Sequence, residues 1–201
     1  YYLSEAGLSG RDIIYDQNNA FNLEIRRCLE FIVANFMGDK ETDDWYFFMT
    51  YIKQIWFANG IHHHYGMEKF TPKFTQEFFD VLLNETGAII SDEAKNIIFN
   101  SETDSKRKVK DPTVDMIVAS ANNFYGEGVT LKMVEEFYNI KIDTLDPRPI
   151  EYGLNSTLVL LNDTLKEEVW KSGGKYGKAI DKIIYNLELA SQVAENEDQK
   201  A

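Results

Sequence analysis

The stretch that most constrains the fold is a run of apolar residues at helical spacing between residues 43 and 59. Asp43 and Asp44 open it, where acidic side chains favour the positive end of a helix dipole. Apolar residues then recur every three or four positions: Trp45, Phe48, Met49, Ile52, Ile55 and Trp56. Asn59 and Gly60 follow, and both tolerate the left-handed conformation that ends many helices. The sequence therefore predicts a buried helix that ends near Asn59.

Similar patterns predict further helices. Within residues 3–36 the helical repeat comprises Leu23, Cys28, Leu29, Ile32 and Val33. Gly7, Gly10 and the polar stretch 16–19 are expected to divide this region into two helices. Thr75, Ser91 and Thr130 each precede an apolar helical run and are expected to cap it. A long helix is expected from about residue 176 to the end of the chain. Residues 114–120 fit either a helix or a strand.

Two short runs rich in apolar and β-branched residues, 154–161 and 165–170, flank Asn162 and Asp163 and predict a β-hairpin. The expected fold class is therefore α+β, predominantly α-helical, with a small β-sheet or hairpin near residues 154–170. We expect residues 1–201 to form a single domain, with a mainly helical part at 1–150 and the hairpin plus a C-terminal helix at 151–201. Neither end carries a start or stop signal, so we expect a fragment of a longer protein.

The charge of the chain argues against two classes of partner. The formal net charge is -12, whereas binding to nucleic acid or to an anionic membrane requires a basic face. No apolar run approaches the roughly 18 residues that span a bilayer. The only cysteine, Cys28, lies in an apolar helical pattern and is expected to be a buried, inert thiol. A single cysteine excludes an intramolecular disulfide and fits the cytoplasm.

Residues 101–112 are rich in charged side chains and include the basic run Lys106, Arg107 and Lys108. In an acidic protein such a run is typical of a solvated loop, which is the favoured interpretation. A nuclear localisation signal or a phosphate-binding patch is the alternative.

All three histidines are adjacent, at His62, His63 and His64, and Tyr65 follows them. Metal ligands must converge on one point, but consecutive side chains diverge by about 100° on a helix and alternate on a strand. The spacing of a zincin motif is absent, as are a nucleophile elbow and a phosphate-binding loop. We therefore predict no metal ligand and no catalytic residue here. Because Gly60 and Gly66 flank the run, a ligand-binding loop and a locally packed loop both remain open.

Several blocks of the sequence resemble the N-terminal part of bacterial dipeptidyl peptidase III, a family of zinc-dependent exopeptidases. They are residues 2–6 (YLSEA), 10–18 (GRDIIYDQN), 56–70 (WFANGIHHHYGMEKF) with Pro72, 122–125 (NNFY), 128–130 (GVT) and 152–156 (YGLNS). The resemblance follows nearly the whole chain in order. It implies two lobes around a cleft, one helical and zinc-bearing, the other mixed with a small β-barrel. This chain resembles part of the second lobe.

The resemblance also implies a role for the histidine loop. It implies that Tyr65 and His64 contact an oligopeptide substrate in the cleft, with Gly60, His62 and His63 as further candidates. The family's zinc motif, HExxGH, does not occur in this sequence, so zinc is expected in the full-length enzyme and not in this chain. The expected partners are the oligopeptide and the zinc-bearing lobe. The alternatives are a non-catalytic peptide- or partner-binding domain and a metalloenzyme that uses His62–His64.

Overall fold

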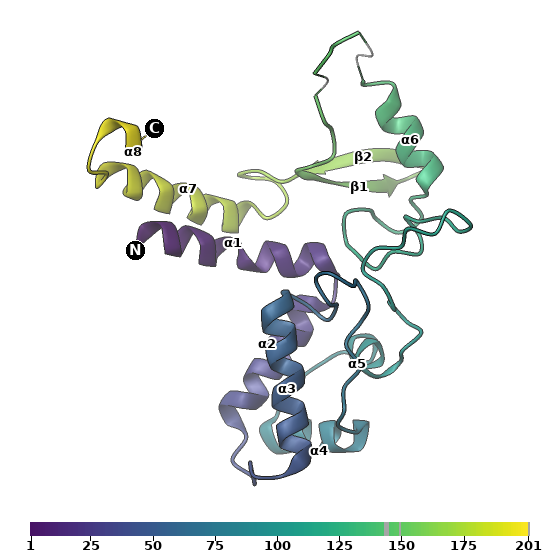
Figure 1. Cartoon of the computed structure of the whole chain (residues 1–201), viewed down its shortest axis with the longest axis vertical. Helices are drawn as coiled ribbons and strands as arrows, with labels where there is room; N and C mark the ends of the chain where they lie inside the picture. The colour runs from purple at the N-terminus through teal and green to yellow at the C-terminus, as the bar shows by residue number, and fades with distance from the viewer. Residues whose placement is uncertain (143–144, 149, 201) are drawn as a thin grey trace. The chain divides into compact units, whose positions relative to one another are not determined.

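Helices and one hairpin are the regular elements of the structure. The computed structural model describes residues 1–142, 145–148 and 150–200. Within these ranges the elements are α1 (Tyr2–Asn18), α2 (Asn22–Asn35), α3 (Asp43–Ala58), α4 (Gln76–Thr86), α5 (Asp92–Phe99), α6 (Leu131–Asn139), β1 (Ser156–Leu161), β2 (Thr164–Val169), α7 (Gly177–Gln192) and α8 (Glu197–Lys200) (Figure 1). The predominantly helical fold with a small two-stranded sheet is confirmed.

The chain divides into two compact units. Unit 1 contains residues 1–14 and 123–201, and unit 2 contains residues 15–122. The single-domain assignment of 1–201, with parts 1–150 and 151–201, stays a prediction. Residues 143, 144, 149 and 201 of those ranges lie outside the described residues.

The hydrophobic core of unit 2 lies among α2, α3, α4 and α5. Its fully buried large side chains include Tyr15, Ile25, Leu29, Ile32, Phe48, Tyr51, Ile52, Ile55, Ile61, Phe79, Leu82 and Ile98. Most of the predicted apolar stripe of α3 therefore faces the core of unit 2. Trp56 departs from it, because 39% of its surface is exposed and its Nε1 donates to Glu30 Oε1 at 3.1 Å. A tryptophan with a polar partner outside the core does not need full burial.

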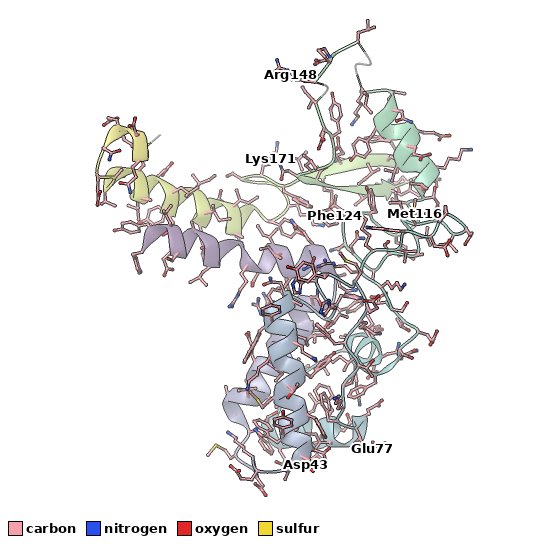
Figure 2. All side chains as sticks on the ribbon, in the orientation of Figure 1. Asp43, Glu77, Met116, Phe124, Arg148 and Lys171 are labelled. Carbon is pink, nitrogen blue, oxygen red and sulfur yellow. The ribbon has the colours of Figure 1, made fainter. Side chains whose placement is uncertain are left out.

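Local signals set the helix ends. The hydroxyls of Thr75, Ser91 and Thr130 accept backbone N–H groups of the first turns of α4, α5 and α6, as predicted. Thr42 does the same for α3. Acidic residues occupy the first turns of α3 and α4, where Figure 2 labels Asp43 and Glu77. The predicted division between α1 and α2 is present after Asn18, whereas Gly7 and Gly10 do not interrupt α1, so that part of the expectation was wrong.

In unit 1, β1 and β2 pair antiparallel from Ser156↔Val169 to Leu161↔Thr164. Asn162 and Asp163 form the two-residue turn, with φ of 49° and 60°. Positive φ at both positions matches the twist of the flanking strands. Residues 124–126 run beside β1, where Leu158 N–H donates to the Phe124 carbonyl at 3.1 Å, and Phe124 is labelled in Figure 2.

Two further expectations, one in each unit, were wrong. The C-terminal helix is not continuous, because α7 ends at Gln192 and the short α8 begins at Glu197. Residues 114–120 form turns, closed by bonds such as Ala119 N–H to the Asp115 carbonyl at 2.9 Å, and are neither helix nor strand. Among the described residues, no helix is both long enough and apolar enough to cross a membrane.

Candidate functional site

The histidine loop, residues 59–70, leaves the end of α3 through two unusual backbone conformations. Asn59 is left-handed, with φ 54° and ψ 46°, which ends α3 as predicted. Gly60 follows with φ 145°, a value that side chains rarely allow. A Cβ atom on Gly60 would lie 2.3 Å from Nδ2 of Asn22. Only glycine fits this position, and Asn22 is the residue that fills the space.

The loop then folds back on itself as an irregular hairpin. The Phe70 N–H donates to the Ile61 carbonyl at 2.8 Å, and the His63 N–H donates to the Glu68 carbonyl at 2.8 Å. The Met67 N–H closes the tip by donating to the His63 carbonyl at 2.9 Å. These bonds hold residues 63–67 at the tip of a defined turn.

A second segment, residues 105–107, lies along the returning arm. The Lys69 N–H donates to the Ser105 carbonyl at 3.0 Å, and the Arg107 N–H donates to the Met67 carbonyl at 2.9 Å. The loop predicted as solvated therefore pairs with the histidine loop through its backbone.

Three asparagines near the α1–α2 junction anchor the histidine loop and its neighbour. Asn18 Nδ2 donates to the Asn59 carbonyl at 2.9 Å. Asn19 Nδ2 donates to Asp104 Oδ2 at 2.6 Å and to the Ala121 carbonyl at 3.0 Å. Asn22 accepts the Ile61 N–H at 3.0 Å. The stretch expected only to separate two helices thus also positions the site.

Lys69 closes the base of the loop. Its ammonium group donates to the carbonyl oxygens of Ile97 at 2.8 Å and Asn100 at 2.6 Å, and also to that of Thr103. Ile97 belongs to the last turn of α5, where carbonyl groups lack helical partners. Burial lowers the pKa of Lys69, and the charges of Asp104 and Glu102 act in the opposite direction. The lysine therefore ties the end of α5 to the histidine loop.

Arg107 is half-buried and is a structural part of the site. Its guanidinium donates to Asn18 Oδ1 at 3.0 Å and to the His64 carbonyl at 3.2 Å, and it contacts Met67 Sδ at 3.2 Å. The favoured interpretation of the Lys106–Lys108 run is therefore wrong for this residue. Its planar fork of donors suits the task of joining several acceptors at once.

His62 is buried, with 2% of its surface exposed. Its Nε2 lies 2.7 Å from the Asp104 carbonyl oxygen, and because a carbonyl only accepts, Nε2 must carry the proton. Burial lowers the pKa of His62, the bond to Asp104 and the Asp104 charge oppose this shift, and Arg107 and Lys69 add to it. His62 is therefore a neutral structural residue, and its Nδ1 is a buried atom without a hydrogen-bond partner.

The rest of the run lies in an aromatic cluster with Phe57 and Phe70. We call Phe57, His63, His64, Tyr65 and Phe70 the exposed aromatic cluster, in which Phe57, His63 and Tyr65 are exposed and His64 and Phe70 are half-buried. The His63 and His64 rings stack with centroids 5.3 Å apart and an interplanar angle of 22°. His64 also contacts Tyr65 at 4.0 Å and Phe57 at 5.1 Å between ring centroids. Phe57 and Tyr65 are 76% and 81% exposed. The cluster therefore presents flat apolar faces to solvent.

The tip of the loop also holds His63 in one orientation. Its Nδ1 accepts the backbone N–H groups of Gly66 at 3.0 Å and Tyr65 at 3.3 Å. The Nδ1 atom of His63 is thus used within the loop, and Nε2 of His62 is used by Asp104. Each of these two imidazoles therefore has one ring nitrogen engaged inside the protein. Among the described residues, no three His, Cys, Asp or Glu side chains gather as a metal site.

The predicted substrate-binding residues separate into two groups. Tyr65, His64 and His63 belong to the exposed aromatic cluster, whereas Gly60 and His62 are buried and support the loop from behind. Sequence reasoning missed Phe57 and Arg107. Phe57 could have been found from the sequence, because it lies outside the apolar stripe of α3 and next to the loop. Arg107 could not, because its contacts come from segments distant in sequence.

Comparison with known proteins adds no family assignment. No protein-family model matches the chain, and no curated protein matches it either. The function is therefore inferred from the residues, their geometry and the resemblance described above.

Proposed function

We propose that this chain is the substrate-binding part of a zinc-dependent dipeptidyl peptidase of the dipeptidyl peptidase III type. The parent enzyme would release dipeptides from the N-termini of oligopeptides. The observation that carries the proposal is the exposed aromatic cluster, which includes Tyr65 and His64, the two residues that the resemblance assigns to substrate contact.

The physical support for binding is the combination of exposure and rigidity. Large aromatic rings exposed side by side are unusual unless a partner covers them, and here Tyr65 and Phe57 are both mostly exposed. The loop beneath them is held by backbone bonds and by Arg107, so little conformational entropy is lost when a ligand binds. Flat rings with polar edges suit the planar peptide groups and side chains of an extended oligopeptide.

The contribution of this chain to the proposed reaction is binding and orientation alone. We assign it no zinc ligand, because three consecutive side chains do not converge on one point, and no proton-transfer group. Zinc, the cofactor of the proposed parent enzyme, would be held by the other lobe, which is the second proposed partner besides the oligopeptide. We also propose a cytoplasmic location, supported by the single cysteine.

The test is the kinetics of dipeptide release by the full-length protein. Tyr65→Ala is expected to raise KM by about ten-fold, the effect of losing one ring contact, and to change kcat less. His64→Ala is expected to act in the same direction. The matched control is Tyr46→Ala, because Tyr46 is also exposed, at 66%, on α3 but lies outside the aromatic cluster.

Each outcome separates the possibilities. An unchanged KM in Tyr65→Ala removes the aromatic cluster from the substrate site. Peptide binding without zinc-dependent dipeptide release by the full-length protein overturns the peptidase proposal and favours a non-catalytic peptide-binding domain. Stoichiometric zinc in the 201-residue chain that is lost in a His62→Ala, His64→Ala double variant would place the metal here after all.

A further inference from the structure

A second constellation lies in unit 1, where α6 meets the hairpin (Figure 1). Lys141 follows the end of α6, and its ammonium nitrogen lies over three aromatic rings. The distances from Nζ to the ring centroids are 3.8 Å for Phe137, 5.2 Å for Tyr138 and 5.7 Å for Tyr152. Each of these rings presents its negative face to a cation. Three rings from two segments of the chain thus converge on one ammonium group.

A carboxylate completes the enclosure. Glu167 of β2 accepts the Lys141 ammonium on Oε2 at 2.9 Å, and its other oxygen accepts the hydroxyls of Tyr138 and Ser156, both at 2.9 Å. Burial alone would raise the pKa of Glu167, but the hydrogen bonds from Lys141, Tyr138 and Ser156 outweigh it and leave the pKa below its ordinary value. The carboxylate therefore stays ionised and fixed in place. We call Phe137, Tyr138, Tyr152 and Glu167 the ammonium cage.

The backbone around the cage is tightly fitted. Gly153 follows Tyr152 with φ 78°, and a Cβ atom on it would lie 3.1 Å from the Tyr138 hydroxyl. Tyr138 and Tyr152 have nearly parallel rings, 26° apart with centroids separated by 6.5 Å. The walls of the cage are therefore positioned by the fold and do not depend on Lys141 alone.

The lysine and its carboxylate partner are both partly open to solvent. Lys141 lies beyond α6, which ends at Asn139, and its side chain is 28% exposed while that of Glu167 is 23% exposed. Lys69 in unit 2 shows the contrast, because its ammonium is bonded to three backbone carbonyls and needs no ring. The Lys69 ammonium is used in structural hydrogen bonds to the backbone, whereas Lys141 lies in a cage that is partly open to solvent.

Aromatic rings around a carboxylate are the arrangement by which proteins bind alkylated ammonium groups from outside. We propose that the ammonium cage is a binding site for an external alkylammonium group that keeps at least one N–H, and that Lys141 occupies this site until such a ligand displaces it. The N–H is required because Glu167 accepts one hydrogen bond from the bound cation. This site is separate from the proposed peptide contact and does not depend on it.

The test uses N,N-dimethylbutylammonium, a tertiary ammonium with one N–H, on the whole 201-residue chain. In the wild-type protein, binding must release Lys141, so acetylation of the Lys141 amine, followed by mass spectrometry, is expected to speed up by about ten-fold at saturation. Lys132 on α6 is the internal reference, because its side chain is 83% exposed and its rate should not change. An unchanged Lys141 rate overturns the proposal and makes Lys141 a structural tie.

Titration calorimetry on variants provides the second measurement. Lys141→Ala and Lys141→Met remove the competing ammonium, and Met keeps the packing of the alkyl chain, so at least one is expected to fold and bind the probe about ten-fold more tightly than wild type. Adding Phe137→Leu should abolish this gain. Adding Glu167→Gln removes the negative charge that faces the bound cation and should weaken binding of the probe. Equal affinity of wild type and both lysine variants would contradict the proposed competition.

A second pair of probes distinguishes two sources of the alkylammonium group, a free small molecule and a lysine side chain. A free amine and a dimethyl-lysine side chain in a short peptide share the chemistry that the cage recognises. If the free amine and the peptide both bind about as tightly as dimethylbutylammonium, the cage recognises the ammonium group alone. Tighter binding of the peptide indicates a lysine side chain as the ligand, and binding of neither to any variant overturns the site.

Discussion

Gly60 and Asn22 are complementary to each other: the space that a Gly60 side chain would need is filled by the Asn22 carboxamide, 2.3 Å from the position of a Cβ atom. From there Asn22 accepts the Ile61 N–H at 3.0 Å and donates to the Tyr15 carbonyl at 2.9 Å. One asparagine thereby joins the end of α1, the start of α2 and the start of the histidine loop. The exposed aromatic cluster depends on this junction for its position.

We expect Gly60→Ala to destabilise the protein by about 3 kcal/mol or more, because it combines a forbidden φ with a clash in a packed junction. Gly87→Ala is the matched control, since Gly87 also has a positive φ, 72°, but has open space around it. That variant should lose only about 1–2 kcal/mol. Urea denaturation of both variants measures the difference, and equal losses would show that the Asn22 contact is unimportant.

Asn22→Ala is expected to lower the free energy of unfolding by about 3 kcal/mol, because the buried Ile61 N–H and Tyr15 carbonyl both lose a partner. Asn35→Ala serves as its control. Asn35 also donates to a carbonyl, that of Phe31 at 2.8 Å, but it does so at the exposed end of α2. Its loss should stay within about 0.5 kcal/mol. Chemical denaturation followed by circular dichroism compares the two, and a small effect of Asn22→Ala would refute the junction.

The stability of unit 2 is expected to fall in mild acid because of His62. Its folded pKa is depressed below the ordinary 6.5, chiefly by burial, so the unfolded chain binds a proton first as the pH falls. The contribution is fully present above pH 6.5 and is lost as the pH falls from there toward the folded pKa. The charged groups facing the imidazole are Asp104, which opposes this shift, and Arg107 and Lys69, which favour it.

Denaturation midpoints measured from about pH 7.5 to about pH 5.5, above the range in which most carboxylates titrate, should reveal this loss. His62→Gln keeps a donor in the place of Nε2 but cannot gain a proton, so its curve should be flatter over the same range. Parallel curves for wild type and His62→Gln would assign the acid sensitivity to other groups.

Cys28 is expected to be chemically inert in the folded protein. Burial, followed by the nearby Glu24 charge, raises the pKa of its thiol from 9.0 to about 12, although the residue borders a cleft of about 670 Å³ beside α2. Because the thiolate is the reactive form, its reaction with a chromogenic disulfide reagent near pH 8 should be slower by about two to three orders of magnitude than in urea. A comparable rate in the folded and unfolded protein would contradict the burial of this thiol.

Features decided by neighbouring residues could be predicted from the sequence. Thr75, Ser91 and Thr130 cap helices because the hydroxyl and the N–H that it accepts are only three residues apart. The turn at Asn162 and Asp163 likewise depends on the two residues that form it. The α+β class follows from the spacing of apolar residues within short windows, so it too could be predicted from the sequence.

Features that join distant segments were missed or misjudged. Arg107 lies in a charged stretch whose composition is typical of a solvated loop. Its hydrogen-bond partners are nevertheless Asn18, His64 and Met67, at least forty positions away. The junction of Asn22 with Ile61 spans 39 positions. The break between α7 and α8 has no glycine or proline to announce it. No local pattern encodes such contacts.

For the histidine run, the sequence by itself determined that three adjacent imidazoles follow a helix end between two glycines and are poorly spaced for a shared metal. Only the tertiary structure decided that His62 is buried while His63 and Tyr65 are exposed and pack against the half-buried His64. The reason is physical: side-chain direction in an irregular loop is set by the groups packed against it. Here those groups, Asn22, Asp104 and Arg107, come from elsewhere in the chain.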